Sequence, residues 1–453
     1  MRIIPKKIKV KNTVWKCYSM PDIIVALIMF SIIFIAITKG VWAIAVIGGL
    51  LSIVMFMPTQ DGIFYACILD NLKFLFAKKS YTSTAVKDKE RIETLIGIKA
   101  LKENGIIEYT NGCFGRVIKV GQKNFGIEDE SEQNIDIGYF SAALKQLDGT
   151  QSAELVKIDR PVNLDVFAGE LFERLEQVKN ADENKVIKKT EILRERIDGI
   201  DRLNNIRKQY LSEYYITVYG RDEAELETTA LNMAAEFAKT GLSTRLLERT
   251  DTAIFLKYSF SRSFDEREAK ALPEESLLTW VLPKKVEFHS NRYLIDGTEA
   301  AVLAVSDYPL RVKNAWGAEL FNIPNTKIVM HVKPVEKFKA IRRIDKCIGE
   351  METKQIISEK ASEANSAETH RASLETLLDN LQTENENLFD VTLTVTAYNY
   401  LNDANFKKTV RRSMITGNFK PSMLYGLQTE GFKSANVSPV SALSNYERGI
   451  NTG

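Results

Sequence analysis

Two apolar stretches without a charged side chain lie near the N-terminus and constrain this chain more than any other feature. They cover residues 23–38 and 41–57, and only Lys39 and Gly40 separate them. A charge in the middle of a bilayer is costly, so charge-free stretches of this length are typical of membrane segments. Trp15 and Trp42 could sit at the interface with water. We therefore expect a transmembrane hairpin followed by a large soluble part.

The charges around the two stretches predict an orientation. Residues 1–20 contain six basic side chains and no acidic one, the second stretch is followed by Lys73, Lys78 and Lys79, and the connection holds only Lys39. The positive-inside rule then places both ends in the cytoplasm, as in a multi-pass protein of the cytoplasmic (inner) cell membrane in contact with the lipid bilayer. A cleaved signal peptide fits less well because the apolar part starts late. A hairpin buried in the core is the other alternative.

The composition excludes several classes of function. The 453 residues suggest about three domains, and 45% hydrophobic with 26% charged residues is ordinary for a globular protein. A net charge of +2 argues against a large nucleic-acid-binding face, although a local basic patch is compatible with it. The four cysteines form no Cys-x-x-Cys pair and the three histidines share no motif spacing, so we expect no metal site and a reducing compartment.

The order of strand and helix patterns predicts an α+β protein. We divide it into residues 1–80 with the hairpin and a juxtamembrane helix, 81–212 with a small β-rich module and a helical arm, and 213–453. Strands are expected at 106–109, 113–120, 125–127 and 153–158, with a charged helical arm over 172–211.

A β-α-β pattern occurs more than once in the last part. Residues 213–219 alternate as a strand, 223–239 form an amphipathic helix, and a second strand begins at 243, with 254–260 as an extension. Similar units surround the strands at 326–332 and 388–398, with a charged helical insertion at about 350–388. We expect ferredoxin-like α+β modules with long charged helical arms, without recognisable identity between the units.

The motifs of common active sites are missing from the sequence. It has no phosphate-binding G-x-x-x-x-G-K-[ST] loop, no G-x-S-x-G, no H-E-x-x-H and no G-x-G-x-x-G. Cys113 is the one candidate nucleophile, but no histidine lies in its part of the chain, so we assign it to packing. The sequence predicts no catalytic, cofactor-binding or metal-binding residues and a protein that is not an enzyme.

Several short motifs, in their order along the chain, carry a resemblance to a known family. Ile4-Pro5-Lys6 and the hairpin resemble the small two-helix inner-membrane subunit of conjugative type IV secretion systems. The rest resembles the N-terminal region of the large transfer ATPase of those systems, through these residues: Gly105-Ile106-Ile107, Gly115-Arg116-Val117, Asn124-Phe125, Glu132-Gln133, Tyr308-Pro309, Trp316, Pro324-Asn325-Thr326, Gln428, Gly431-Phe432, Pro439 and Arg448-Gly449-Ile450-Asn451.

The resemblance implies a membrane-anchored docking subunit of a DNA- or protein-transfer apparatus. Such a subunit positions a transfer ATPase at the channel, works in a homo- or hetero-oligomer, and has no nucleotide-binding domain of its own, because the chain ends at Gly453 where that domain begins in the family. Two alternatives stay open. The chain is a generic membrane-tethered scaffold of another secretion or envelope machine, or it is the N-terminal fragment of a longer transfer ATPase.

Overall fold

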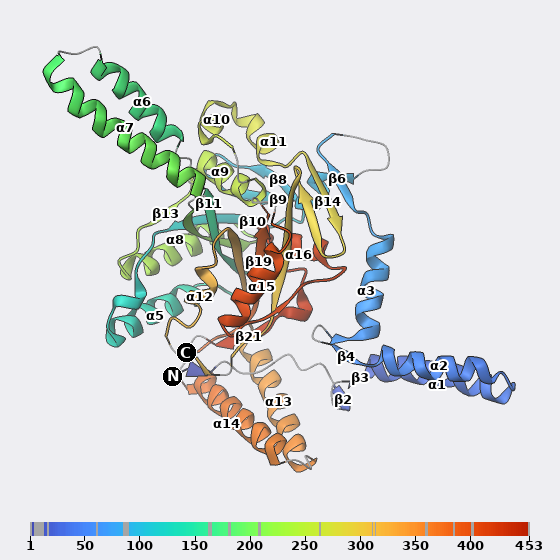
Figure 1. Cartoon of the computed structure of the whole chain (residues 1–453). Coiled ribbons are helices and arrows are strands. Elements are labelled where there is room, and N and C mark those ends of the chain that lie inside the picture. Colours follow the sequence, from blue (N-terminus) through green and yellow to red (C-terminus); the bar gives the residue numbers. More distant parts are fainter. Residues whose placement is uncertain are drawn as a thin grey trace.

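One long, mostly antiparallel sheet organises the computed structural model (Figure 1). The structure describes residues 2–3, 13–15, 18–59, 62–84, 90–161, 165–179, 183–206, 210–261, 264–309, 311–312, 314–357, 361–383, 386–399 and 403–451. Within them 15 strands belong to this sheet, whose main path runs β7-β6-β14-β15-β16-β19-β18-β11-β12-β10-β9-β8.

The first half of the sheet is a β-α-β-β-α-β module. Its elements in chain order are β10 (Phe114–Val120), α5 (Glu130–Leu144), β11 (Ser152–Pro161), β12 (Tyr210–Gly220), α8 (Glu223–Lys239) and β13 (Thr244–Leu246). Asp129 and Asp222 begin the two helices, because each side chain accepts a hydrogen bond from a backbone N–H of the first turn. β12 lies between β10 and β11, and β10 lies between β12 and β13.

The second half repeats this topology. It contains β16 (Thr298–Asp307), α12 (Ala318–Phe321), β18 (Thr326–Val335), β19 (Leu388–Tyr398), α15 (Phe406–Thr416) and β20 (Lys420–Ser422). β19 lies between β16 and β18, and β16 lies between β19 and β20. In each module the two strands that flank a helix are separated by a third strand, which is the split β-α-β arrangement of ferredoxin-like folds.

An antiparallel seam between β11 and β18 joins the two modules edge to edge. Six residue pairs form it, from Ala153 opposite Val332 to Ile158 opposite Lys327. Lys157 and Asp159 of β11 are buried at this seam and bind the loop before β18, where the Lys157 ammonium donates to the carbonyl of Ile323 at 3.0 Å and Asp159 accepts from the Thr326 N–H at 3.1 Å. The seam removes two exposed strand edges at once.

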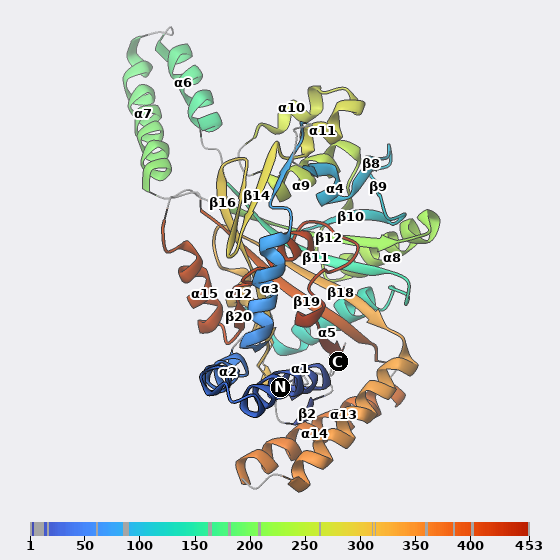
Figure 2. The same cartoon turned by 90° about the vertical axis from the view of Figure 1, so that its right-hand side faces the viewer.

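Each module carries a helical arm at the same topological position, between its second and third strands. The arm of the first module is α6 (Asp165–Lys179) with α7 (Glu183–Ile206), and the arm of the second is α13 (Lys337–Ile357) with α14 (Ala361–Thr383). Figures 1 and 2 both show the two arms projecting from the body of the protein in opposite directions. A narrow row of apolar side chains holds the two helices of each arm together. In the first arm, for example, Leu175 packs against Leu193 and Ile197.

The remaining elements extend the sheet or cover it. Strands β6 (Ser80–Thr82), β7 (Glu90–Arg91), β8 (Ile98–Leu101), β9 (Ile107–Tyr109), β14 (Lys285–His289), β15 (Arg292–Ile295) and β21 (Arg448–Asn451) extend it. Helices α4 (Ile92–Ile96), α9 (Arg249–Phe260), α10 (Glu266–Ala271), α11 (Leu277–Val281) and α16 (Gln428–Ser434), with the 3₁₀ turns η2 (Glu274–Ser276) and η3 (Ser444–Tyr446), lie against it. Short ladders pair β1 (Arg2–Ile3) with β17 (Arg311–Val312), β2 (Thr13–Trp15) with β3 (Tyr18–Ser19), and β4 (Pro58–Thr59) with β5 (Gly62–Ile63).

The N-terminal stretches form a helical hairpin, but the prediction that it is transmembrane is wrong. The hairpin consists of α1 (Met20–Thr38) and α2 (Trp42–Met55), and α3 (Phe64–Phe76) connects it to the sheet. Among the described residues, no helix combines the length and the apolarity needed to cross a membrane. The apolar part of α1 is about 24 Å long and α2 about 21 Å, against roughly 30 Å of bilayer core. The predicted location, a multi-pass protein of the inner membrane, is wrong for the same reason.

Other expectations meet the structure with mixed results. The α+β class is confirmed, and the strand predicted at 388–398 has those bounds as β19. Residues 125–127 form the 3₁₀ turn η1 (Phe125–Ile127) rather than a strand. Residues 254–260 belong to helix α9, whose buried side chains pack on the sheet. The charged helical insertion expected at about 350–388 belongs to two antiparallel helices, α13 and α14.

Candidate functional site

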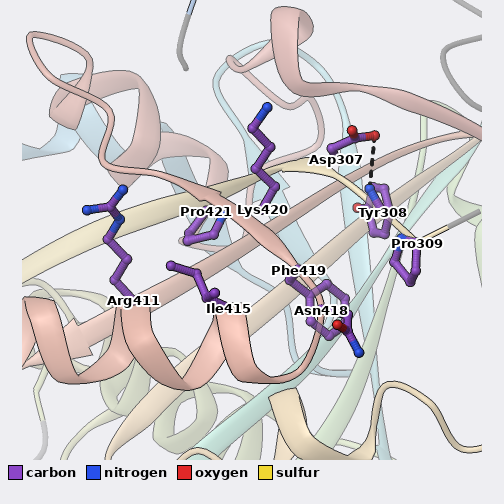
Figure 3. Close-up of a pocket in the computed structure, with 9 residues that line it drawn as sticks. All are labelled: Asp307, Tyr308, Pro309, Arg411, Ile415, Asn418, Phe419, Lys420 and Pro421. Atoms are coloured by element: carbon purple, nitrogen blue, oxygen red, sulfur yellow. Dashed lines mark hydrogen bonds between the residues drawn. The ribbon is translucent and has the colours of Figure 1, made fainter. Parts of the chain in front are cut away.

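The second module contains a cavity of about 300 Å³ between the end of β16, the C-terminal half of α15 and the start of β20 (Figure 3). Its polar lining comes from Asp307, Arg411, Asn418 and Lys420, and its apolar lining from Tyr308, Pro309, Ile415, Phe419 and Pro421. Strand pairing brings these segments together, since Asp307 lies opposite Lys420 in the β16–β20 ladder. The Ser306 hydroxyl donates to the carbonyl of Lys420 at 2.9 Å and fixes the same junction.

An aromatic cluster forms the base of the cavity. The rings of Trp316 and Phe419 stack with their centroids 4.8 Å apart, and Tyr308 meets both rings edge-on. Tyr308 is 8% exposed, and its hydroxyl has no hydrogen-bond partner among the described residues. Burial raises the pKa of this phenol, with Arg448 acting in the opposite direction, so the hydroxyl keeps its proton. A buried donor without an acceptor costs free energy. A ligand oxygen that accepted a hydrogen bond from this hydroxyl would therefore be stabilising.

Helix α15 provides the positive charge at the cavity. Its apolar side, Phe406, Val410 and Met414, is buried against the sheet. Lys408, Arg411 and Arg412 lie on the side that leads to Ile415 and the cavity, because residues three and four apart share a helix face. We call Lys408, Arg411, Arg412 and Lys420 the cationic patch. Among the described residues, no carboxylate forms an ion pair with Lys408, Arg412 or Lys420.

The charges of α15 are unfavourable for the helix itself. Lys407 and Arg411, and likewise Lys408 and Arg412, are like-charged pairs four residues apart, which destabilise a helix by roughly 0.2–0.5 kcal/mol per pair. Lys407 and Lys408 also occupy the first turn, where the helix dipole disfavours cations. Burial lowers the pKa of Lys407, and Arg292 acts in the same direction against Glu299. Local choices that oppose stability are typical of functional surfaces.

The corresponding junction of the first module is closed. There the chain leaving β10 bonds directly to the chain entering β13, through the Gly121 N–H and the Ser243 carbonyl at 2.7 Å. A Cβ at Gly121 would lie 2.4 Å from the Ser243 hydroxyl, so the glycine permits this close approach. Lys123 donates to the carbonyl of Thr240 at the end of α8, at 3.0 Å. The cavity is therefore specific to the second module and is not a consequence of the shared topology.

A second polar site lies where residues 435–440, which we call the C-terminal strap, cross the sheet at the seam. Tyr109 donates to the carbonyl of Val437 at 3.0 Å, and Ser152 donates to the carbonyl of Pro439 at 3.1 Å. Glu154 accepts from the Ser438 N–H at 3.2 Å and from the Tyr219 hydroxyl at 2.7 Å. Side chains of the first module and of the adjacent strand β9 thus hold the backbone of the strap.

Helix α16, which leads into the strap, is anchored by Gln428. This fully buried side chain accepts from the N–H of Val302 at 3.0 Å and donates to its carbonyl at 3.1 Å, as a neighbouring strand would. A Cβ at Gly431 would lie 3.1 Å from Val302, so the helix can approach β16 closely. Phe432 packs edge-on against Phe288 and Tyr293.

Two titratable side chains face each other beneath the strap. Glu154 and His331 are directly opposite in the β11–β18 ladder. Burial raises the pKa of Glu154 to about 7, although Tyr219, Ser438 and Lys327 pull it down. Burial lowers the pKa of His331 to about 4, with Lys333 acting in the same direction and the Pro439 carbonyl opposing both. At neutral pH the histidine is uncharged, and the glutamate is close to its midpoint.

The structure assigns structural positions to the motifs singled out in the sequence. Gly105 has a φ of +82°, and a Cβ there would lie 2.2 Å from the Leu247 carbonyl. Gly115 packs between the rings of Tyr109 and Tyr219. Cys113 is half-buried at the edge of the main core. Residues 4–6 lie outside the described residues.

Of the residues at the cavity and its aromatic cluster, Tyr308, Pro309 and Trp316 were singled out in the sequence only for the family resemblance, not as site residues, and the cations were not singled out. The missed signal was the pattern Lys407-Lys408 and Arg411-Arg412, four basic residues in a helix without an acidic one. In the described part of the chain no group of three His, Cys, Asp or Glu side chains is arranged to hold a metal ion. Comparison of the sequence with protein-family models and with curated proteins finds no match.

Proposed function

We propose that this chain is a docking subunit of a conjugative type IV secretion apparatus that holds a transfer ATPase in position. The observation that supports this most is how the resemblance motifs meet. Gly115 packs between the rings of Tyr109 and Tyr219. Tyr109 donates to the carbonyl of Val437, and Tyr219 donates to Glu154, which in turn accepts from the N–H of Ser438, one residue before Pro439. Segments that carry the resemblance, more than 300 residues apart in sequence, therefore meet in one joint.

The architecture fits a positional role. Two modules fused through a buried seam form a stiff platform, and the arms and the hairpin α1–α2 project from it. Large apolar side chains of the hairpin are exposed, among them Phe30, Phe34, Trp42 and Ile53. Exposed apolar surface of this extent is typical of an interaction site. Holding a motor next to a channel raises its effective concentration there without any chemistry in the subunit itself.

Co-purification tests this proposal. The full chain, carrying an affinity tag, is produced in cells that retain its neighbouring genes, crosslinked before lysis and purified, and its partners are identified by mass spectrometry. We expect a nucleotide-hydrolysing transfer subunit together with channel proteins. A tagged chain that brings down no such ATPase after crosslinking contradicts the proposal, provided that crosslinks within the chain itself are found.

A further inference from the structure

We propose that the cavity beside α15 binds an acidic, extended segment of a partner protein, with one apolar side chain in the cavity and its flanking carboxylates on the cationic patch. The inference rests on the proposed docking function and names the chemistry of the partner at this site. Three properties of the site carry it: the charge, the size of the cavity and the unpartnered hydroxyl at its base.

The charge selects an anionic partner. Arg411 and Lys420 line the cavity, and Lys408 and Arg412 continue the patch along α15. Asp307 is the only acidic residue of the lining, and it accepts from the N–H of Tyr308 at 3.1 Å (Figure 3). Asp307 also interacts electrostatically with Arg448. The patch therefore keeps an excess of positive charge on a chain that is almost neutral as a whole. Carboxylates would relieve the like-charge repulsion along the helix.

The size and lining of the cavity select a side chain rather than a cofactor. About 300 Å³ is at the lower limit for small-ligand sites. Pro309, Ile415 and Pro421 make its walls apolar, and Ile415 is 52% exposed although it borders the cavity. An aliphatic or aromatic side chain of a partner would cover it. α15 is about 16 Å long, which matches about five residues of extended peptide.

The aromatic residues argue for a peptide over a nucleic acid. Single-stranded nucleic acids are bound by exposed rings on which bases stack. Here Tyr308 and Phe419 are buried, and Trp316 stacks on Phe419, so these rings face one another rather than solvent. The Tyr308 hydroxyl, 8% exposed and without a partner among the described residues, can instead donate to a backbone carbonyl or a carboxylate of a bound segment.

Fluorescence anisotropy with the full chain tests the inference. The probe is a fluorescein-labelled pentapeptide with two glutamates on either side of a leucine. We expect saturable binding that weakens as salt is raised, because the contacts are between charges at the surface. The same peptide with glycine in place of leucine should bind at least about tenfold more weakly.

Charge and cavity variants locate the binding. Lys408→Glu with Arg412→Glu should weaken peptide binding by about tenfold or more, and Ile415→Ser should weaken it several-fold. The matched controls are Lys270→Glu with Lys354→Glu, which changes the net charge equally, and Ile356→Ser, which removes an isoleucine that is 84% exposed on α13. Both controls should bind as the unaltered chain does. All variants should unfold at the same temperature as the parent.

Three outcomes overturn the inference: no binding of the leucine peptide, equal loss in the control variants, or tighter binding of a single-stranded oligothymidine of the same charge. The last result would identify a nucleic-acid site instead. The experiment needs no other subunit of the apparatus. If the peptide does not bind but a transfer ATPase co-purifies, only this inference is wrong. If the peptide binds but no ATPase co-purifies, the proposed function is wrong and the peptide-binding cavity remains supported.

Discussion

Replacing Lys157 with methionine should lower the free energy of unfolding by about 3–5 kcal/mol, because it leaves a buried carboxylate at the seam without its cation. The Lys157 ammonium and the Asp159 carboxylate are 2.6 Å apart, and their side chains are 1% and 2% exposed. Lys157 also donates to the Ile323 carbonyl of the second module, which would keep only its bond from the Thr326 hydroxyl. The loss can be measured by denaturant unfolding.

Two further variants make this result specific. Combining Lys157→Met with Asp159→Asn removes the orphaned charge and keeps an acceptor for the Thr326 N–H, so the double variant should be more stable than Lys157→Met alone. Lys99→Met breaks the exposed Lys99–Glu108 pair and should change the free energy of unfolding far less, because solvent screens this pair. A Lys157→Met protein as stable as the parent would show that the seam does not depend on these groups.

The parent should lose stability relative to the Glu154→Gln variant as the pH rises. The difference between their free energies of unfolding should change by about 3 kcal/mol between about pH 5 and about pH 8, to the disadvantage of the parent. Glu154 is fully buried, and its pKa is raised from 4.5 to about 7. The folded protein therefore binds this proton more tightly than the unfolded chain. The stabilisation is fully present below the unfolded pKa and is lost as the pH rises through the folded pKa, when a buried charge must form.

The comparison with Glu154→Gln isolates this group from its neighbours. His331 has a pKa lowered to about 4, so it contributes the opposite slope, with stability lost as the pH falls from its ordinary value near 6.5. Burial raises the pKa of the Tyr109 and Tyr219 phenols, which also face the site, so they keep their protons in this range. The charge of Lys327 acts on Glu154 in the opposite direction to burial. Glu103→Gln, at an exposed position, serves as the control and should leave the parent's pH profile unchanged. A parent and a Glu154→Gln variant with parallel profiles would contradict the assignment.

Local patterns in the sequence were sufficient for most elements of the two modules. Residues 388–398 alternate in hydrophobicity and form β19, and the amphipathic stretch 223–239 is α8 with Asp222 as its cap. Residues 254–260 were predicted to extend the β-α-β unit. Their run of apolar side chains is compatible with a strand and with a helix. They are helical because α9 is buried on one side against the sheet, a tertiary contact that local propensity does not include.

Long-range pairing could not be predicted from one sequence. The seam joins strands about 170 residues apart, and neither strand carries a local signal for the other. Repeated ferredoxin-like modules were expected within 213–453, but the module from β10 to β13 was not recognised, because the arms, 165–206 and 337–383, interrupt both modules. The hairpin was misjudged because the apolar stretches 23–38 and 41–57 were counted without the bounds of the helices, and α2 ends at Met55, before its stretch does. The cationic patch was visible in α15, but the cavity beside it depends on β16 and β20 meeting.

We propose that the second module docks a partner of a DNA-transfer machine through the cationic patch. The most direct measurement is the frequency of conjugative transfer from cells whose only copy carries Lys408→Glu with Arg412→Glu, compared with Lys270→Glu with Lys354→Glu. At equal protein levels, we expect the transfer frequency to fall by about tenfold or more for the first pair of substitutions and to stay unchanged for the second. Equal transfer by both variants and the parent would contradict it.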